Sequence, residues 1–99
     1  MRYESEDLGV SFELPDILTV REQLLFRSRI AERARESYFA RYWYAAQTVI
    51  REWQCDAIPD PAAFDMDDPD EGGTLANVVM WVANTVTGHM AGIDIPPKN

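Results

Sequence analysis

The sequence predicts an all-α protein, a small bundle of about three helices with an extended N-terminal arm and an acidic, proline-rich loop. Three observations support this prediction. Residues 38–53 place their large apolar side chains on one helical face, a capping motif marks a helix start near residue 19, and a further apolar face recurs over residues 74–91. With 99 residues, the chain is expected to form one domain with a modest core.

Residues 1–18 are expected to form an arm or a short strand. Residues 10–14 alternate apolar and polar side chains ahead of Pro15, which is typical of an extended segment. Because one short strand cannot form a sheet alone, this arm would lie on the helices or pair with another chain.

Residues 20–54 are predicted to form two helices, roughly 20–31 and 35–54, or alternatively one bent helix. Thr19 and Glu22 have the spacing of a capping box, in which the N-cap side chain and the side chain three positions later each accept a backbone N–H. On the second helix an arc of roughly 140° holds the apolar residues. These are Tyr38, Phe39, Tyr42, Trp43, Ala46, Val49, Ile50 and Trp53.

Residues 55–73 are predicted to be an acidic loop, because several prolines and a Gly-Gly pair exclude a long helix there. Ile58 and Phe64 are expected to attach this loop to the core. An EF-hand calcium site does not fit, since one register places Pro69 at a ligand position and the other lacks the final Glu. We therefore expect a solvated loop without a metal.

Thr74 is predicted to be the N-cap of the last helix, residues 74–91. His89 lies within its apolar arc, so we expect a partly buried histidine with hydrogen-bond partners. The arc consists of Leu75, Val78, Val79, Val82, Ala83, Val86, His89 and Met90.

Composition excludes several classes of function. A net charge of −8 argues against nucleic-acid binding, which requires a basic surface. A single cysteine, Cys55, fits a reducing compartment, and no signal peptide or membrane-spanning run is present, so a cytoplasmic protein without a membrane partner is expected. There is no phosphate loop, dinucleotide motif or zinc spacing, and no motif supplies a partner for His89. We expect neither an enzyme nor a cofactor.

Charge is unevenly distributed along the chain. Residues 20–53 contain seven Arg and four Glu, whereas residues 54–73 contain seven acidic residues and no basic one. The acidic segments are expected to lie back on the Arg-rich helices or to be solvated.

Four residues are candidates for contact with a protein partner: Tyr44, Arg51, Met80 and Trp81. Tyr44 falls on the polar arc of its helix between arginines, and Trp81 falls well outside the apolar arc of the last helix. Exposed aromatic residues near Arg are typical of interface hot spots. Alternatively, the arm at residues 10–14 or the proline-rich loop covers them within the chain.

Three stretches of the chain resemble small proteins from the tail-gene modules of long-tailed bacteriophages and prophages, close to the tail assembly chaperones. The first, residues 12–24, begins Phe12-Glu13-Leu14-Pro15-Asp16; the third comprises the predicted last helix, residues 74–91, and residues 95–99. The second, residues 43–60, contains Trp43, Ala46, Ile50, Trp53, Cys55 and Ile58-Pro59-Asp60.

The resemblance implies a small, non-enzymatic helical protein of the host bacterial cytoplasm. It would keep the tape-measure protein soluble while tail-tube subunits assemble, and such short chains tend to self-associate. Two other functions remain open from the residues. One is an acidic, phage-encoded inhibitor that mimics nucleic acid and blocks a host protein; the other is a minor structural component of the virion.

Overall fold

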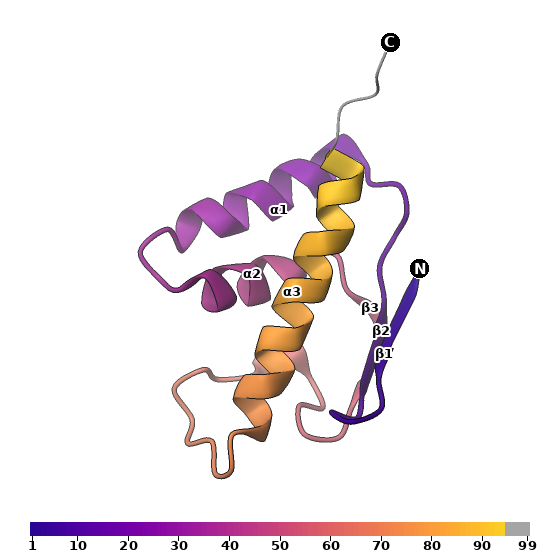
Figure 1. The fold of residues 1–99 in the computed structure, drawn as a ribbon. Coiled ribbons are helices and arrows are strands. Elements are labelled where there is room, and N and C mark those ends of the chain that lie inside the picture. The colour runs from indigo at the N-terminus through magenta and orange to yellow at the C-terminus, as the bar shows by residue number, and fades with distance from the viewer. Residues whose placement is uncertain (95–99) are drawn as a thin grey trace.

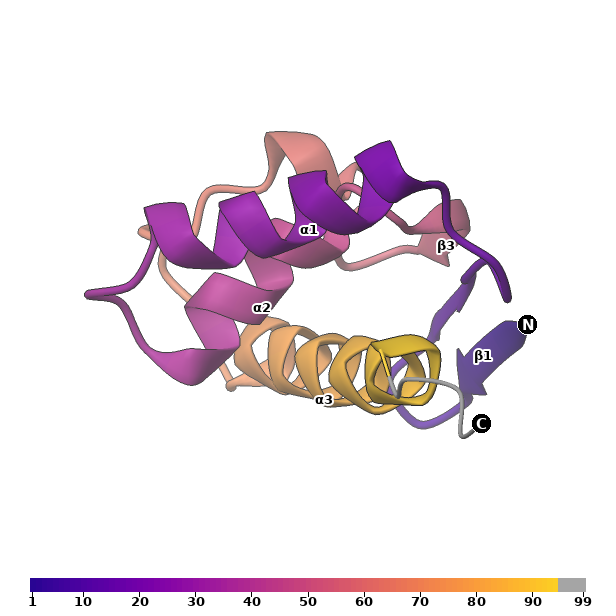
Figure 2. The ribbon, with the colours of Figure 1, turned by 90° about the horizontal axis from the view of Figure 1, so that it is seen from above.

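A computed structural model describes residues 1–94, which form three α-helices and a three-stranded antiparallel sheet. The fold is therefore mixed α/β, and the all-α prediction is wrong. In Figures 1 and 2, α2 lies between α1 and α3, and the sheet stands at one end of α1 and α2 and alongside α3. The elements in chain order are β1 (Arg2–Ser5), β2 (Val10–Glu13), α1 (Val20–Glu32), α2 (Tyr38–Ala46), β3 (Arg51–Cys55), a 3₁₀ turn (Pro61–Ala63) and α3 (Thr74–Asp94).

The central strand of the sheet is β2, which pairs antiparallel with β1 on one side and β3 on the other. The turn between β1 and β2 contains Gly9 at a φ of 63°, a conformation that costs little without a Cβ. The pairing of β2 with β3 is irregular between Ser11 and Glu13, where Glu52 has a φ of 53°. This is a β-bulge, and it bends the strand locally. The arm at residues 10–14 is thus a strand paired within its own chain.

The second predicted helix, residues 35–54, is wrong over its last turns, because α2 ends at Ala46 and residues 51–55 form β3. The amide of Gln47 donates to the carbonyl of Trp43 at 2.9 Å, and the Thr48 hydroxyl donates to the carbonyl of Ala45 at 2.7 Å. These side chains satisfy carbonyls that a longer helix would have paired. The backbone N–H and C=O groups of the residues that follow, in β3, pair with those of β2.

The start of α1 confirms the predicted capping box. The Thr19 hydroxyl accepts the Glu22 backbone N–H at 3.1 Å, and Glu22 accepts the Thr19 N–H at 3.1 Å. Ser37 caps α2 separately, so the chain contains two helices here and not one bent helix.

The last helix, α3, is buried on two sides. The predicted apolar arc is confirmed, with Val78, Val82, Ala83 and Val86 fully buried. On another side, the ring of Trp81 meets Phe12 of β2 edge-on at a centroid distance of 5.7 Å. No helix within residues 1–94 is both long enough and apolar enough to cross a membrane.

The cap of α3 differs from the prediction. The carboxylate of Asp70, rather than Thr74, accepts the N–H groups of Leu75 at 3.0 Å and Ala76 at 2.8 Å. An acidic side chain at a helix N-terminus both pairs free N–H groups and complements the helix dipole. The loop is therefore tied to the start of α3 through one of its carboxylates.

The core joins the sheet to the helices, and Phe12 lies at its centre with no exposed surface. Its ring is 6.0 Å from Tyr3, 6.0 Å from Trp53 and 5.7 Å from Trp81, measured between centroids. Aromatic pairs in this range each contribute about 0.5–1.5 kcal/mol beyond simple burial.

Candidate functional site

Tyr44 is held against α1 and is only half-exposed. Arg29 donates to its hydroxyl at 2.5 Å, and the hydroxyl donates to Glu32 at 3.0 Å. The guanidinium groups of Arg29 and Arg33 lie over the Tyr44 ring at 4.8 and 4.1 Å from its centroid. The sequence places Tyr44 between Arg41 and Arg51, whereas the arginines beside it in the structure are Arg29 of α1 and Arg33, the C-cap of that helix.

Arg51 and Trp81 lie apart from Tyr44 and also have partners within the chain. Arg51 forms an ion pair with Glu22 at 2.8 Å on the outer surface. Trp81 is half-buried against Phe12, so the strand at residues 10–13 covers it, as the alternative interpretation proposed. The four predicted residues therefore do not form one continuous site.

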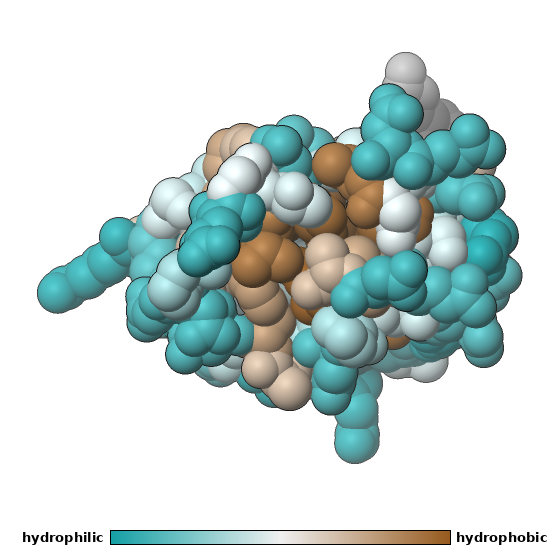
Figure 3. All heavy atoms as spheres, turned by 90° about the horizontal axis from the view of Figure 1, so that it is seen from below, coloured by the Kyte–Doolittle hydropathy of each residue, from teal (hydrophilic) through white to brown (hydrophobic). Residues whose placement is uncertain are grey.

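Met80 lines an apolar hollow between α2, the acidic loop and the first turns of α3. Its volume is about 280 Å³. Figure 3 shows apolar side chains gathered on this end of the molecule, with hydrophilic side chains around them. The apolar hollow is lined by Ser37, Phe39, Ala40, Phe64, Met66, Asp68, Asp70, Leu75, Ala76, Val79 and Met80.

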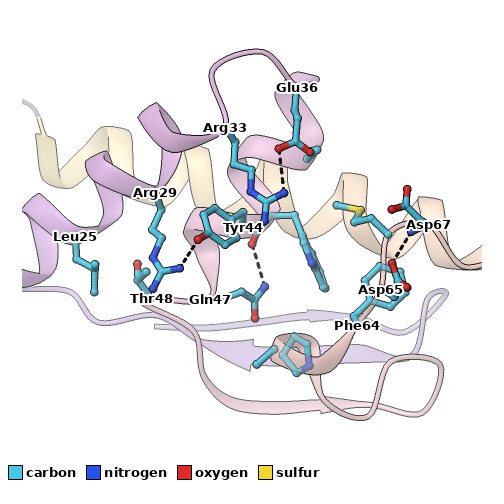
Figure 4. Close-up of a pocket in the computed structure, with 15 residues that line it drawn as sticks. Leu25, Arg29, Arg33, Glu36, Tyr44, Gln47, Thr48, Phe64, Asp65 and Asp67 are labelled. Atoms are coloured by element: carbon cyan, nitrogen blue, oxygen red, sulfur yellow. Dashed lines mark hydrogen bonds and ion pairs between the residues drawn. The ribbon is translucent and has the colours of Figure 1, made fainter.

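A second, larger depression of about 620 Å³ adjoins the apolar hollow. The two share the lining residues Ala40, Phe64 and Met66, so they lie next to each other. We call the larger one the polar groove; Figure 4 shows it from the side. Its remaining lining residues are Leu25, Arg29, Arg33, Glu36, Trp43, Tyr44, Gln47, Thr48, Pro61, Ala62, Asp65 and Asp67.

The acidic loop does not lie back on the arginines. The ion pairs that join described side chains are Arg33 with Glu36 at 3.0 Å and Arg51 with Glu22, and neither uses a loop carboxylate. Asp65 instead accepts the N–H of Asp67 at 2.9 Å. Within residues 1–94, no three His, Cys, Asp or Glu side chains gather as a metal-ligand set.

Arg33 remains charged over the polar groove. Its hydrogen bond to Glu36 raises the pKa of the guanidinium, and the nearby hydroxyl of Tyr44 adds to the effect. The groove thus keeps two cationic side chains, Arg29 and Arg33, beside an aromatic surface.

The two residues with catalytic potential, His89 and Cys55, line neither of these two depressions. Nδ1 of His89 lies 2.8 Å from the Tyr3 hydroxyl, and Nε2 lies 2.7 Å from the carbonyl of Pro15. This confirms the prediction of a partly buried histidine with hydrogen-bond partners. Cys55 is buried at the end of β3, opposite Val10.

Sequence reasoning missed most of the residues that line the two depressions. Phe39 was assigned to the core, and Phe64 was expected only to attach the loop, which it does by contacting the core from its half-buried position. Sequence reasoning also missed an aliphatic ridge at the start of α1, formed by Ile17, Val20 and Leu24, which are 87, 74 and 62% exposed. The available signal was three aliphatic side chains close to the capping box, on the side of the helix where polar residues are expected.

The chain matches no protein-family model, no curated protein and no solved structure. Residues 95–99, which contribute to the bacteriophage resemblance, lie outside the described residues.

Proposed function

We propose that the chain is a non-enzymatic tail assembly chaperone of a long-tailed bacteriophage or prophage. It binds the tape-measure protein in the host bacterial cytoplasm and keeps it soluble while tail-tube proteins assemble. The observation that carries the proposal is the apolar hollow, an exposed apolar concavity at the junction of α2, the loop and α3. The resemblance of residues 12–24 and 43–60 to tail-module proteins supplies the identity of the client.

The mechanism is reversible capture of the apolar face of an amphipathic helix. A volume of about 280 Å³ is at the lower end of ligand pockets, so it suits a few apolar side chains of a larger partner. Met66 and Met80 line it, and methionine adapts its shape to different apolar surfaces.

Co-expression with the tape-measure protein from the same genome tests the proposal. The wild-type chain should keep the tape-measure protein soluble and co-purify with it. Met80→Lys should abolish co-purification, because a charge would enter the apolar hollow. Leu24→Lys is the matched control, since it makes the same change on the aliphatic ridge and should leave co-purification intact. Circular dichroism verifies that both variants fold.

If Leu24→Lys lost co-purification and Met80→Lys did not, the binding surface would lie on the aliphatic ridge and not in the apolar hollow, which would contradict the proposal. A tape-measure protein that stays insoluble with the wild-type chain would contradict the chaperone function itself.

A second candidate function, the nucleic-acid mimic, is favoured by the loop carboxylates, which form no ion pair with the described arginines. A mimic would bind its host target through these charges, so binding should weaken steeply with salt. Changing Asp65, Asp67 and Asp68 to Asn together tests this, while Asp70 is kept because it caps α3. Under the chaperone proposal, apolar contact dominates, so the triple variant should still co-purify with at least part of the tape-measure protein at moderate salt.

A further inference from the structure

The polar groove has opposite charges at its two ends. Figure 4 shows Arg29 near Leu25 and Thr48 at one end, and Asp65 and Asp67 beyond Phe64 at the other. Between these ends, Arg33 and Glu36 are paired at 3.0 Å and neutralise each other, beside the aromatic side chains of Trp43 and Tyr44. The groove therefore presents a charge order to any segment that lies along it.

Arg29 is the basic end of the groove. It is half-buried and forms no ion pair with a described residue. Its Nη1 donates to the hydroxyl of Tyr44, which in turn donates to Glu32, so a carboxylate is linked to Arg29 only through this hydroxyl. A half-buried cation without a direct anionic partner costs free energy, and a carboxylate of the partner that pairs with the guanidinium would lower this cost.

At the acidic end, Asp65 and Asp67 are exposed and carry no ion pair with a described residue. The Asp65 carboxylate accepts the Asp67 backbone N–H at 2.9 Å. Both side chains are thus available to a basic group, and Phe64 and Met66 connect this end to the apolar hollow.

We propose that the polar groove orients the bound helix by charge: an Asp or Glu of the partner pairs with Arg29, and a Lys or Arg pairs with Asp65 and Asp67. This inference rests on the proposed function and adds the charge order of the client segment. Apolar residues on the same segment fill the apolar hollow. The partner is thereby specified as an amphipathic helix with an acidic residue at one end and a basic residue at the other.

Two synthetic peptides of about 16 residues, long enough to populate a helix, serve as probes. Both have a leucine face and a Lys near one end; the first has Glu near the other end, and the second has Gln in its place. Fluorescence anisotropy should show the wild-type chain binding the Glu peptide about tenfold more tightly than the Gln peptide. In Arg29→Gln this preference should disappear, and Arg29→Glu should instead prefer a peptide with Lys at that position.

A control variant separates the specific charge of Arg29 from the overall charge of α1. Arg21→Gln removes a charge from an exposed position of α1 that lines neither depression, and it should retain the preference for the Glu peptide. The inference is overturned if wild type binds neither peptide, if it binds the two within about twofold of each other, or if the preference survives in Arg29→Gln.

The co-expression assay distinguishes failure of this inference from failure of the proposed function. Arg29→Gln should recover less tape-measure protein than wild type. Full recovery with Arg29→Gln, combined with loss in Met80→Lys, would refute the charge order and leave the chaperone function standing. Full recovery in both variants would refute both.

Discussion

Phe12→Ala tests whether the sheet is an integral part of the core. Phe12 has no exposed surface and touches the rings of Tyr3, Trp53 and Trp81 at centroid distances of 5.7–6.0 Å. Truncating a buried Phe to Ala costs about 3–5 kcal/mol. Because three aromatic partners lose their contact at once, we expect a value near the upper end, about 4–5 kcal/mol.

The loss would be a large fraction of the total stability, which is about 5–15 kcal/mol for a domain of this size. Urea unfolding monitored by far-UV circular dichroism measures it, and the dependence on urea should stay unchanged if unfolding remains two-state. In a thermal scan the midpoint should fall by about 4–8 °C per kcal/mol. Phe12→Leu keeps most of the volume and should cost only about 1.5–3 kcal/mol.

Tyr38→Ala is the matched control, since Tyr38 is 42% exposed on α2. It should cost less than about 1 kcal/mol, as is usual for surface positions. If Phe12→Ala also costs less than about 1.5 kcal/mol, the helices are stable without the sheet and the shared core is refuted.

Three further predictions concern polar contacts. His89→Leu should lower the unfolding free energy by about 1–3 kcal/mol, because two partly buried hydrogen-bond partners, the Tyr3 hydroxyl and the Pro15 carbonyl, lose their contact; His89→Gln should recover part of this in the same urea assay. Asp70→Ala should cost about 0.5–2 kcal/mol through the lost cap of α3, whereas Asp68→Ala should be nearly neutral. The hydrogen bond from the Thr19 backbone N–H lowers the pKa of Glu22, so its contribution is present above the unfolded pKa and is lost as pH falls through the folded one. The stability advantage of wild type over Glu22→Gln should therefore shrink between about pH 5 and pH 3, and an advantage independent of pH would contradict this assignment.

The fold was predictable where a local signal decided the structure. The capping box at Thr19 and Glu22 and the apolar arc of α3 depend on neighbouring residues, and both are present. The end of α2 was not predictable this way, because Val49, Ile50 and Trp53 fit a continued helix as well as a turn followed by a strand. What decides is the pairing of β3 with β2, about 40 residues earlier in the chain, and periodicity carries no information on such pairing.

The strand β1 was not predicted, and this omission led to the wrong fold class. In the structure, residues 2–5 alternate exposed and half-buried side chains, and a turn containing Gly9 follows them. In the sequence, Tyr3 is the one apolar residue of the four, so no alternation indicates a strand that could pair with residues 10–14. A lone strand at residues 10–14 could only be assigned to an arm. The fold was therefore predicted to be all-α, because the pairing strand β1 was not recognised.

The candidate site was predictable only in part, because the sequence identifies residue types but not which of them share a cavity. Helical projection placed Tyr44 between Arg41 and Arg51, yet the arginines beside its ring are Arg29 and Arg33, from α1 and its C-cap. Met80 was the one predicted residue that lines the apolar hollow. Phe64 and Met66 reach the same place through the course of the loop, for which no sequence pattern exists.

The sheet determines which part of α3 remains for a partner. One side of the helix packs on α2, and the side that holds Trp81 packs on Phe12, so the middle of α3 is covered on both sides. A bundle without the sheet would expose Trp81 and make it the natural contact for a client. With the sheet in place, the exposed apolar surface moves to the first turns of α3, where Leu75, Ala76 and Met80 meet the loop. The strand that overturned the predicted fold class therefore also moves the expected binding surface, from the centre of the helix to its beginning.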